Sequence, residues 1–75
     1  MRIEYTGLAE INGSLIALDG VEGVSYDELA EITLRDGSRR HGRVILIDGK
    51  RVVLEVFEGT SGIDLKNTGT RFLGK

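Results

Sequence analysis

The sequence predicts an all-β fold, a small closed six-stranded β-barrel that forms a single domain. Short runs rich in Ile, Val, Leu and Thr alternate apolar and polar residues, as half-buried strands do. Between these runs lie Asn-Gly and Asp-Gly dipeptides, which favour tight turns because both residue types tolerate positive φ. They are Asn12-Gly13, Asp19-Gly20, Asp36-Gly37 and Asp48-Gly49. The length of 75 residues allows one domain.

The runs and turns place six strands in order along the chain. We expect them near residues 2–11, 14–19, 29–35, 39–48, 51–57 and 70–74. The hairpin that joins the fourth strand to the fifth through Asp48-Gly49 has the clearest signal, because a turn dipeptide separates two alternating runs. Ser25 could cap one helical turn over residues 25–29, which is too short to form a helix of its own.

Alternation within the strands predicts which side chains form the core. In residues 30–34, Ile32 and Leu34 should share one face and Thr33 should lie on the other. The expected core residues are Leu15, Leu18, Ile32, Leu34, Val44, Leu46, Val53, Val56 and Phe72.

Glycines are expected to shape the turns, and part of the sequence repeats. Gly13, Gly49, Gly59 and Gly62 are the expected structural turn residues, and Gly59 and Gly62 should have backbone angles that residues with a Cβ avoid. Displaced by 36 positions, seven of nineteen residues from position 11 onward are identical to residues 47–65. Such a repeat predicts a barrel built from two similar halves with pseudo-two-fold symmetry.

The composition is that of an ordinary globular domain, with 40% hydrophobic and 29% charged residues. The absence of cysteine excludes disulfides and thiolate metal sites, and the single His41 excludes a multi-histidine metal site. No apolar run approaches the roughly 18 residues of a membrane span, and no secretory leader opens the chain. We therefore expect a soluble, cytoplasmic protein without direct membrane contact.

The net charge of −2 is unevenly distributed. Residues 1–34 carry seven acidic side chains against Arg2 alone, whereas residues 35–75 carry nine Lys or Arg against five acids. This asymmetry fits head-to-tail protein contacts or one basic face toward an anionic partner, and it equally fits a chance distribution.

Candidate catalytic motifs are incomplete, so no enzyme, cofactor or metal is expected. The loop Gly59–Gly62 resembles a phosphate-binding turn, but no Gly-Lys-Ser/Thr follows it and Asp64 would repel phosphate. Ser61 lacks a nucleophile elbow, and His41 lies among arginines rather than beside an acid that would orient it. The neighbours Asp27-Glu28 should point apart, which suits paired acid–base catalysis poorly.

The basic segment Arg39–Arg43 is the best sequence signal for nucleic-acid binding, because a positive strand on a small barrel can follow a phosphate backbone. Against this alternative, the aromatic residues are scattered and the pI is about 5.3. They are Tyr5, Tyr26, Phe57 and Phe72. The expectation is therefore no nucleic-acid partner, with a stand-alone barrel that binds single strands as the alternative.

Two long stretches resemble a known family. Glu4-Tyr5-Thr6, Ile11–Leu15 and Val21–Glu28 are similar to the opening of the non-catalytic B subunit of archaeal and bacterial V-type (A-type) rotary ATPases. Val56–Thr68, followed by Arg71-Phe72, resembles the end of the N-terminal domain of that same protein. The resemblance covers nearly the whole chain, and it implies that residues 1–75 are one N-terminal six-stranded β-barrel domain.

The resemblance also implies partners. Three such barrels would alternate with the barrels of the catalytic A subunits in a crown ring on the hexamer and would contact the peripheral stalk, with no nucleotide chemistry of their own. Family members usually have proline at the position of Ser14, and they continue for several hundred residues. We therefore expect an excised or redesigned barrel that, alone, is a monomer or a weak dimer.

Overall fold

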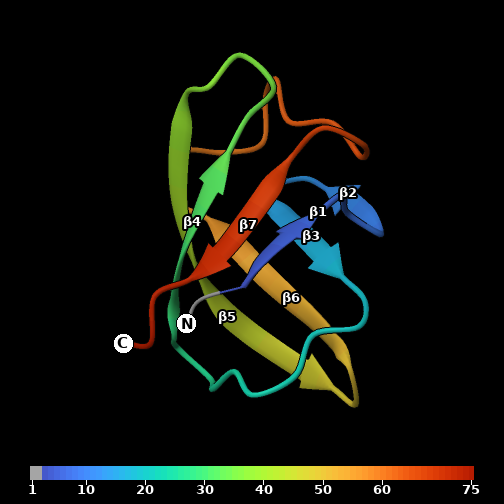
Figure 1. Cartoon of the computed structure of the whole chain (residues 1–75), viewed down its shortest axis with the longest axis vertical. Helices are drawn as coiled ribbons and strands as arrows, with labels where there is room; N and C mark the ends of the chain where they lie inside the picture. The colour runs from blue at the N-terminus through green and yellow to red at the C-terminus, as the bar shows by residue number, and fades with distance from the viewer. Residues whose placement is uncertain (1–2) are drawn as a thin grey trace.

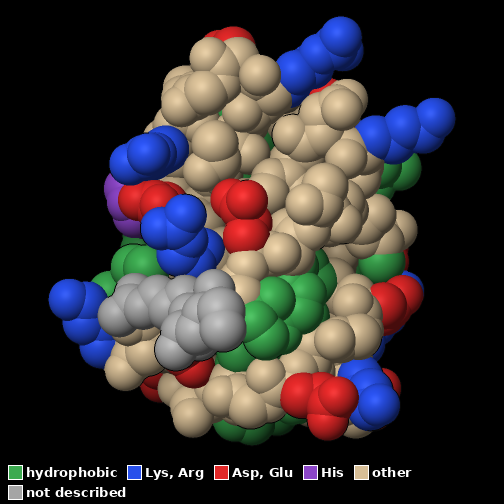
Figure 2. All heavy atoms as spheres, in the orientation of Figure 1, with side chains coloured by type: hydrophobic (Ala, Val, Ile, Leu, Met, Phe, Trp, Pro, Cys, Tyr) green, Lys and Arg blue, Asp and Glu red, His purple; other side chains and the backbone are tan. Residues whose placement is uncertain are grey.

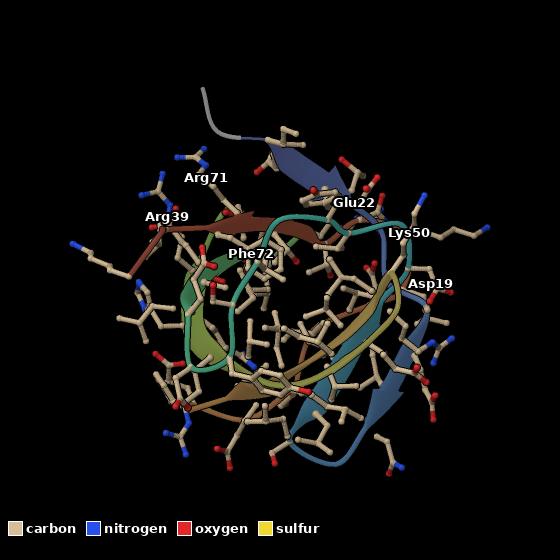
Figure 3. All side chains as sticks on the ribbon, turned by 90° about the horizontal axis from the view of Figure 1, so that it is seen from below. Asp19, Glu22, Arg39, Lys50, Arg71 and Phe72 are labelled. Carbon is tan, nitrogen blue, oxygen red and sulfur yellow. The ribbon has the colours of Figure 1, made fainter. Side chains whose placement is uncertain are left out.

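The computed structural model describes residues 3–75, which form an all-β fold (Figure 1). The strands are β1 (Glu4–Thr6), β2 (Glu10–Asn12), β3 (Leu15–Leu18), β4 (Leu29–Thr33), β5 (Arg39–Asp48), β6 (Arg51–Val56) and β7 (Gly69–Phe72). They form one antiparallel sheet in the order β1-β7-β4-β5-β6-β3-β2. The sheet curls strongly, so that its strands surround the core side chains when the molecule is viewed from below (Figure 3). Within residues 3–75, no helix is long and apolar enough to cross a membrane.

The expected first strand, residues 2–11, is two strands in the structure, so the sheet has seven strands rather than six. Arg2 lies outside the described residues. The break occurs at Gly7, which has φ of 88°, a left-handed conformation that interrupts an extended strand. β1 and β2 are the two edges of the sheet, and over residues 3–75 no ladder pairs them with each other, so the strand pairing does not confirm the predicted closed barrel.

Three linker residues carry the chain from one edge of the sheet to the other. The Gly7 N–H donates to the Thr68 carbonyl at 2.8 Å, and the Leu8 N–H donates to the Leu65 carbonyl at 2.8 Å. The Ala9 N–H then donates to the Ala17 carbonyl on β3 at 2.7 Å. The linker is therefore hydrogen-bonded along its length although it belongs to neither strand.

The other five expected strands are present with small changes at their ends. β5 begins and ends at the predicted residues, 39 and 48, and it continues into β6 through the expected hairpin. The loop of this hairpin is Gly49-Lys50, with Gly49 at φ of 60° as its first residue. Ile32 and Leu34 are both buried and Thr33 is partly exposed, which confirms the predicted alternation.

The core lies inside the curled sheet and includes six of the nine expected residues. Its buried apolar members are Ile16, Leu18, Val21, Ala30, Ile32, Leu34, Val44, Val52, Leu54, Val56, Ile63 and Phe72. Tyr5 packs edge-to-face on Phe72, with ring centroids 5.9 Å apart.

Leu46, Val53 and Leu15 were expected in the core, and the structure shows that these three predictions are wrong. The β5–β6 register shifts between Val44 and Leu46, so Ile45 is the extra residue of a β-bulge. After the bulge the alternation of β5 reverses, so Leu46 is 50% exposed. Val53 faces outward because β6 alternates regularly and buries Val52, Leu54 and Val56 instead. Leu15 is half-buried because its neighbour Ile16 is the β3 residue that points inward.

The sequence repeat includes two hairpins, β2–β3 and β5–β6, and the pseudo-two-fold symmetry of the whole fold stays a prediction. Each has a two-residue loop that starts with a glycine, Gly13 at φ of 62° and Gly49 at φ of 60°. The hairpins lie side by side because β3 pairs antiparallel with β6. Later in each copy the structures differ: Leu29 begins β4, whereas its counterpart Leu65 lies in the long connection to β7.

Candidate interaction surfaces

The basic segment Arg39–Arg43 forms the first half of β5, and alternation along the strand separates its side chains. Arg39, His41 and Arg43 are exposed on the outer face of the sheet, whereas Gly42 is buried against β6. Arg40 is half-buried, and its Nη1 donates to the carbonyl of Gly59 at 2.8 Å. The segment therefore presents two arginines and His41 outward, and its third arginine, Arg40, holds a loop.

Acidic side chains from other elements pair with the outward arginines. Arg39 lies 3.7 Å from Glu31 on β4, and Arg43 lies 3.5 Å from Asp27 and 3.8 Å from Glu55 on β6. A stripe that binds a phosphate backbone needs cations in excess over acids. The fold instead surrounds these arginines with carboxylates, which argues against the nucleic-acid alternative.

His41 lies between two glutamates, contrary to the expectation that it has no acidic neighbour. Its Nε2 is 4.0 Å from Glu31 Oε2, and its Nδ1 is 3.7 Å from Glu58 Oε2. The His41 backbone N–H also donates to Glu58 Oε1 at 3.0 Å, and this bond lowers the pKa of the Glu58 carboxyl. Sequence reasoning missed both partners because neither is near residue 41 in the chain.

The His41 arrangement has the geometry of a cross-strand polar contact rather than of a catalytic or metal site. The two carboxylates approach opposite nitrogens of the ring, so they cannot converge on one ion or one substrate atom. In the part of the chain that the structure describes, no group of three or more His, Cys, Asp or Glu residues is placed to hold a metal.

The glycine loop, residues 59–62, is held by hydrogen bonds to its own backbone and to neighbouring loops. Gly59 and Gly62 have φ of 82° and 84°. The Gly59 N–H donates to Val56 O at 3.0 Å, and the Thr60 hydroxyl donates to the carbonyl of Gly13. A phosphate-binding loop needs several free N–H groups that point at one position. Here the Gly59 N–H is already paired with Val56, and the Thr60 side chain binds the loop to the β2–β3 turn.

Asp64 shapes the next turn, a role that the sequence patterns did not predict. Its Oδ1 accepts hydrogen bonds from the backbone N–H groups of Asn67 at 2.6 Å and Lys66 at 3.0 Å. The bond from Asn67 is the main reason that the pKa of Asp64 lies below its ordinary value. The spacing of an Asp two and three residues before these N–H groups is the signal of an Asx turn.

The adjacent residues Asp27 and Glu28 point to different partners. Asp27, which has φ of 67°, pairs with Arg43, whereas Glu28 accepts hydrogen bonds from the backbone N–H groups of Ser25 at 3.0 Å and Gly74 at 2.8 Å. The Leu29 N–H also donates to the carbonyl of Lys75 at 2.6 Å. These contacts fix the C-terminal segment against the start of β4.

The outer surface of β3, β6 and β5 is aliphatic, and we call Leu15, Ile45, Leu46 and Val53 the aliphatic face. Ladder pairing brings Leu46, Val53 and Ala17 into one row across the three strands. A shallow groove beside them is lined by Leu15, Ala17, Val53, Glu10, Asn12 and Arg51. At its end, Arg51 binds Asp19 at 2.9 Å and Glu10 at 3.4 Å, and these acids raise its pKa.

The outer surface of β1, β7 and β4 is charged, and we call Glu4, Arg71, Glu31 and Arg39 the charged face. Register places Arg71 between Glu4 and Glu31 across the three strands. Side chains of both signs are mixed over the face that carries β1 and β7 (Figure 2). In the view from below, Arg39 and Arg71 lie at the left of the molecule, and Asp19, Glu22 and Lys50 lie at its right (Figure 3).

Comparison with known proteins agrees with the sequence resemblance. Residues 8–74 match the family model described as the ATP synthase alpha/beta family, beta-barrel domain. The chain is 47% identical over 72 residues to a V-type ATP synthase beta chain of Thermotoga neapolitana. It is 44% identical over 73 residues to the B subunit of an A-type ATP synthase of Cenarchaeum symbiosum, and 45% identical over 73 residues to the B subunit of a V-type proton ATPase of Dictyostelium discoideum.

The matches cover nearly all of this chain and a small part of each relative. They include 96% of the chain for the Thermotoga protein and 97% for the other two. They span 16% of the length of the first two relatives and 15% of the third. The similarity is therefore to one domain of a much longer protein.

Proposed function

This chain belongs to the ATP synthase alpha/beta family, whose beta-barrel domain it matches, and from that premise we propose that it is an assembly module of a V- or A-type rotary ATPase. In this proposal residues 1–75 are the N-terminal barrel of the non-catalytic B subunit. The observation that carries the proposal is the match over residues 8–74, together with relatives of this kind from three organisms at 44–47% identity.

The proposed partners are the N-terminal barrels of the A subunits on either side in a crown ring, and the peripheral stalk above it. A ring that alternates two kinds of subunit uses heterologous contacts, so each barrel needs two unlike surfaces. The aliphatic face of this sheet is the candidate for one of these two surfaces. In such a complex the domain belongs to the soluble, cytoplasmic part and does not contact the membrane.

We propose that the domain has no catalytic activity and binds no nucleotide. The groups that could serve chemistry are used in structural contacts: Asp64 holds a turn, Arg40 holds Gly59, and His41 lies between two glutamates. Titration calorimetry with Mg-ATP should give no binding heat at millimolar nucleotide. Tight, magnesium-dependent ATP binding would contradict this part of the proposal.

A domain exchange tests the assembly role directly. The matching segment of the Thermotoga neapolitana beta chain is replaced by residues 1–75, and a second variant simply lacks the segment. We expect the exchanged beta chain to co-purify with the catalytic subunits in a hexamer, and the shortened beta chain to lose this assembly. Equal assembly of both variants would show that the barrel is not an assembly module.

A further inference from the structure

The aliphatic face exposes two consecutive hydrophobic side chains of one strand, whereas consecutive side chains of a regular strand point to opposite faces of the sheet. Ile45 and Leu46 are consecutive in β5, yet they are 37% and 50% exposed, because the bulge turns both outward. Val53 and Leu15 extend the apolar surface across β6 and β3. A contiguous apolar patch with a polar margin on a soluble domain is typical of a protein-binding surface.

Resting on the proposed assembly role, we propose that the aliphatic face is the surface on which a neighbouring subunit docks, and that this partner has an aliphatic centre with lysine and arginine at its margin. The basic margin that we propose for the partner follows from the acidic side chains around the aliphatic face. Asp48 lies opposite Arg51 in the β5–β6 ladder, and Glu55 lies opposite Arg43.

The margin of the aliphatic face is acidic even after its ion pairs are counted. Arg51 has two acidic partners, Asp19 and Glu10, and Arg43 also has two, Asp27 and Glu55. With Asp48 the margin has five carboxylates against two guanidiniums, and Lys50 in the β5–β6 loop leaves this excess unchanged because it pairs with Glu22. Interfaces pair surfaces of opposite potential, so an excess of carboxylates selects a partner with an excess of cations.

A second copy of this chain fits the aliphatic face poorly. A two-fold dimer through this face would bring the two acidic margins against each other, because an isologous interface uses the same surface twice. A head-to-tail contact with the charged face would place Leu46 against Arg71 and its glutamates, which would then lose solvent without apolar partners. A different subunit with a basic margin avoids both costs.

The test uses the full-length catalytic subunit of the Thermotoga neapolitana V-type ATP synthase as the probe, titrated into the 75-residue chain at about 50 mM salt. Leu46→Asp places a charge at the centre of the face, and Leu65→Asp is its matched control, because Leu65 is 48% exposed outside the face. Glu55→Lys reverses a charge at the margin. Its control is Glu31→Lys, which likewise removes a glutamate partner of an arginine. Thermal unfolding verifies that each variant is folded.

We expect the dissociation constant to rise at least about tenfold for Leu46→Asp and Glu55→Lys, and by less than about twofold for the two controls. Raising the salt to about 500 mM should weaken wild-type binding, because salt screens the attraction between the acidic margin of this chain and the basic margin of its partner. Wild-type binding that survives Leu46→Asp and is lost with Glu31→Lys would overturn this proposal and leave the assembly role standing. A wild-type chain that does not bind the catalytic subunit would contradict the assembly role, and the docking surface with it.

Discussion

Gly42 on β5 lies directly against the backbone of Glu55 on β6. A Cβ placed on Gly42 would overlap the Glu55 carbonyl oxygen and would lie 3.2 Å from its carbonyl carbon. Neither atom can move aside as the end of a flexible side chain could, because both belong to a strand that is paired on both sides. Gly42 is therefore required for the close approach of β5 and β6, although its φ is not in the left-handed region.

Gly42→Ala should destabilise the domain strongly, by about 3 kcal/mol or more, because the added methyl forces the two backbones apart. Gly62→Ala is the control. Its Cβ would meet its nearest atoms at 3.6 and 3.7 Å, which is ordinary contact, so only the backbone angle opposes it. Denaturant unfolding of both variants measures the difference. Equal losses of stability would mean that β5 and β6 tolerate a side chain at this crossing.

Gly62→Val should cost on the order of 1–3 kcal/mol, because Gly62 has φ of 84° and a β-branched residue is strained there. Gly62→Asn should cost less, since asparagine tolerates the left-handed region better than other residues with a side chain. Melting temperatures of the two variants make the comparison. An unchanged melting temperature for Gly62→Val would show that the loop does not depend on this conformation.

Two buried threonines, Thr70 on β7 and Thr68 just before it, should change the stability of the domain in opposite directions when each is replaced by valine. In the part of the chain that is described, Thr70 Oγ1 is the one buried side-chain polar atom without a hydrogen-bond partner. Thr68 Oγ1, by contrast, donates to the Asp64 carbonyl at 2.6 Å and accepts from the Asp64 N–H at 3.3 Å.

Thr70→Val should therefore stabilise the domain by about 1 kcal/mol, because it removes an unsatisfied hydroxyl and keeps the shape. Thr68→Val should destabilise it by about 1–3 kcal/mol, because the carbonyl and the N–H of Asp64 lose their partner. Urea unfolding at neutral pH distinguishes the two. Destabilisation by Thr70→Val would indicate that its hydroxyl has a partner in solution.

Stability should be nearly constant from neutral pH down to about pH 5 and should decrease below about pH 4.5. The pKa values of Asp64, Asp36 and Glu58 are lowered in the folded state, by hydrogen bonds from Asn67, Ser38 and His41 respectively. The unfolded chain, with pKa values of about 4, therefore binds protons first as the pH falls, and protonation favours unfolding.

Asp64→Asn should reduce this acid sensitivity, because it removes a carboxyl group whose pKa is lowered in the folded state. Asp48→Asn is a suitable control: among the described hydrogen bonds none from a backbone N–H goes to the Asp48 carboxylate. The measurement is the melting temperature between about pH 7 and about pH 2.5. An unaltered pH profile in Asp64→Asn would exclude Asp64 as a source of the acid response.

Predictions from local patterns agreed with the structure where the backbone is regular. β5, the β5–β6 hairpin and the alternation around Ile32 follow from period-two patterning and turn residues. The bulge at Ile45 left no signal of this kind, since no glycine or proline lies there, and it moved Leu46 out of the core. Val53 lies outside the core for a simpler reason, because β6 alternates regularly and buries Val52, Leu54 and Val56. Patterns in the sequence predict alternation, but they do not predict the residue at which alternation reverses.

The surroundings of the charged residues could not be predicted either. His41 and Arg43 have acidic neighbours on β4, on β6 and in loops, which only the strand order brings together. The Arg39–Arg43 segment looks basic in the sequence because its acidic partners are distant along the chain. Sequence reasoning identified the basic segment Arg39–Arg43 but not its acidic partners, which only the topology brings close. It also placed Leu15, Leu46 and Val53 in the core, so it missed the aliphatic face.

The last prediction concerns the isolated chain, which should be a monomer at micromolar concentration. The acidic residues 1–34 and the basic residues 35–75 do not form separate sides of the molecule: Glu31 pairs with Arg39, and Asp19 pairs with Arg51. The charge asymmetry of the sequence is thereby largely neutralised within one molecule, which weakens head-to-tail attraction between copies. The acidic margin of the aliphatic face opposes a two-fold dimer as well.

Multi-angle light scattering at about 20 mM and about 150 mM salt measures the oligomeric state of the isolated chain. We expect the monomer mass of 8.2 kDa at both ionic strengths. Any weak dimer should increase with salt rather than decrease, because screening reduces the repulsion between acidic margins while apolar contact persists. A dimer that forms at low salt and dissociates at about 150 mM would instead show that oppositely charged surfaces of two copies attract each other. A stable ring of this chain at about 150 mM salt would mean that its contact surfaces are matched to each other rather than to a different subunit.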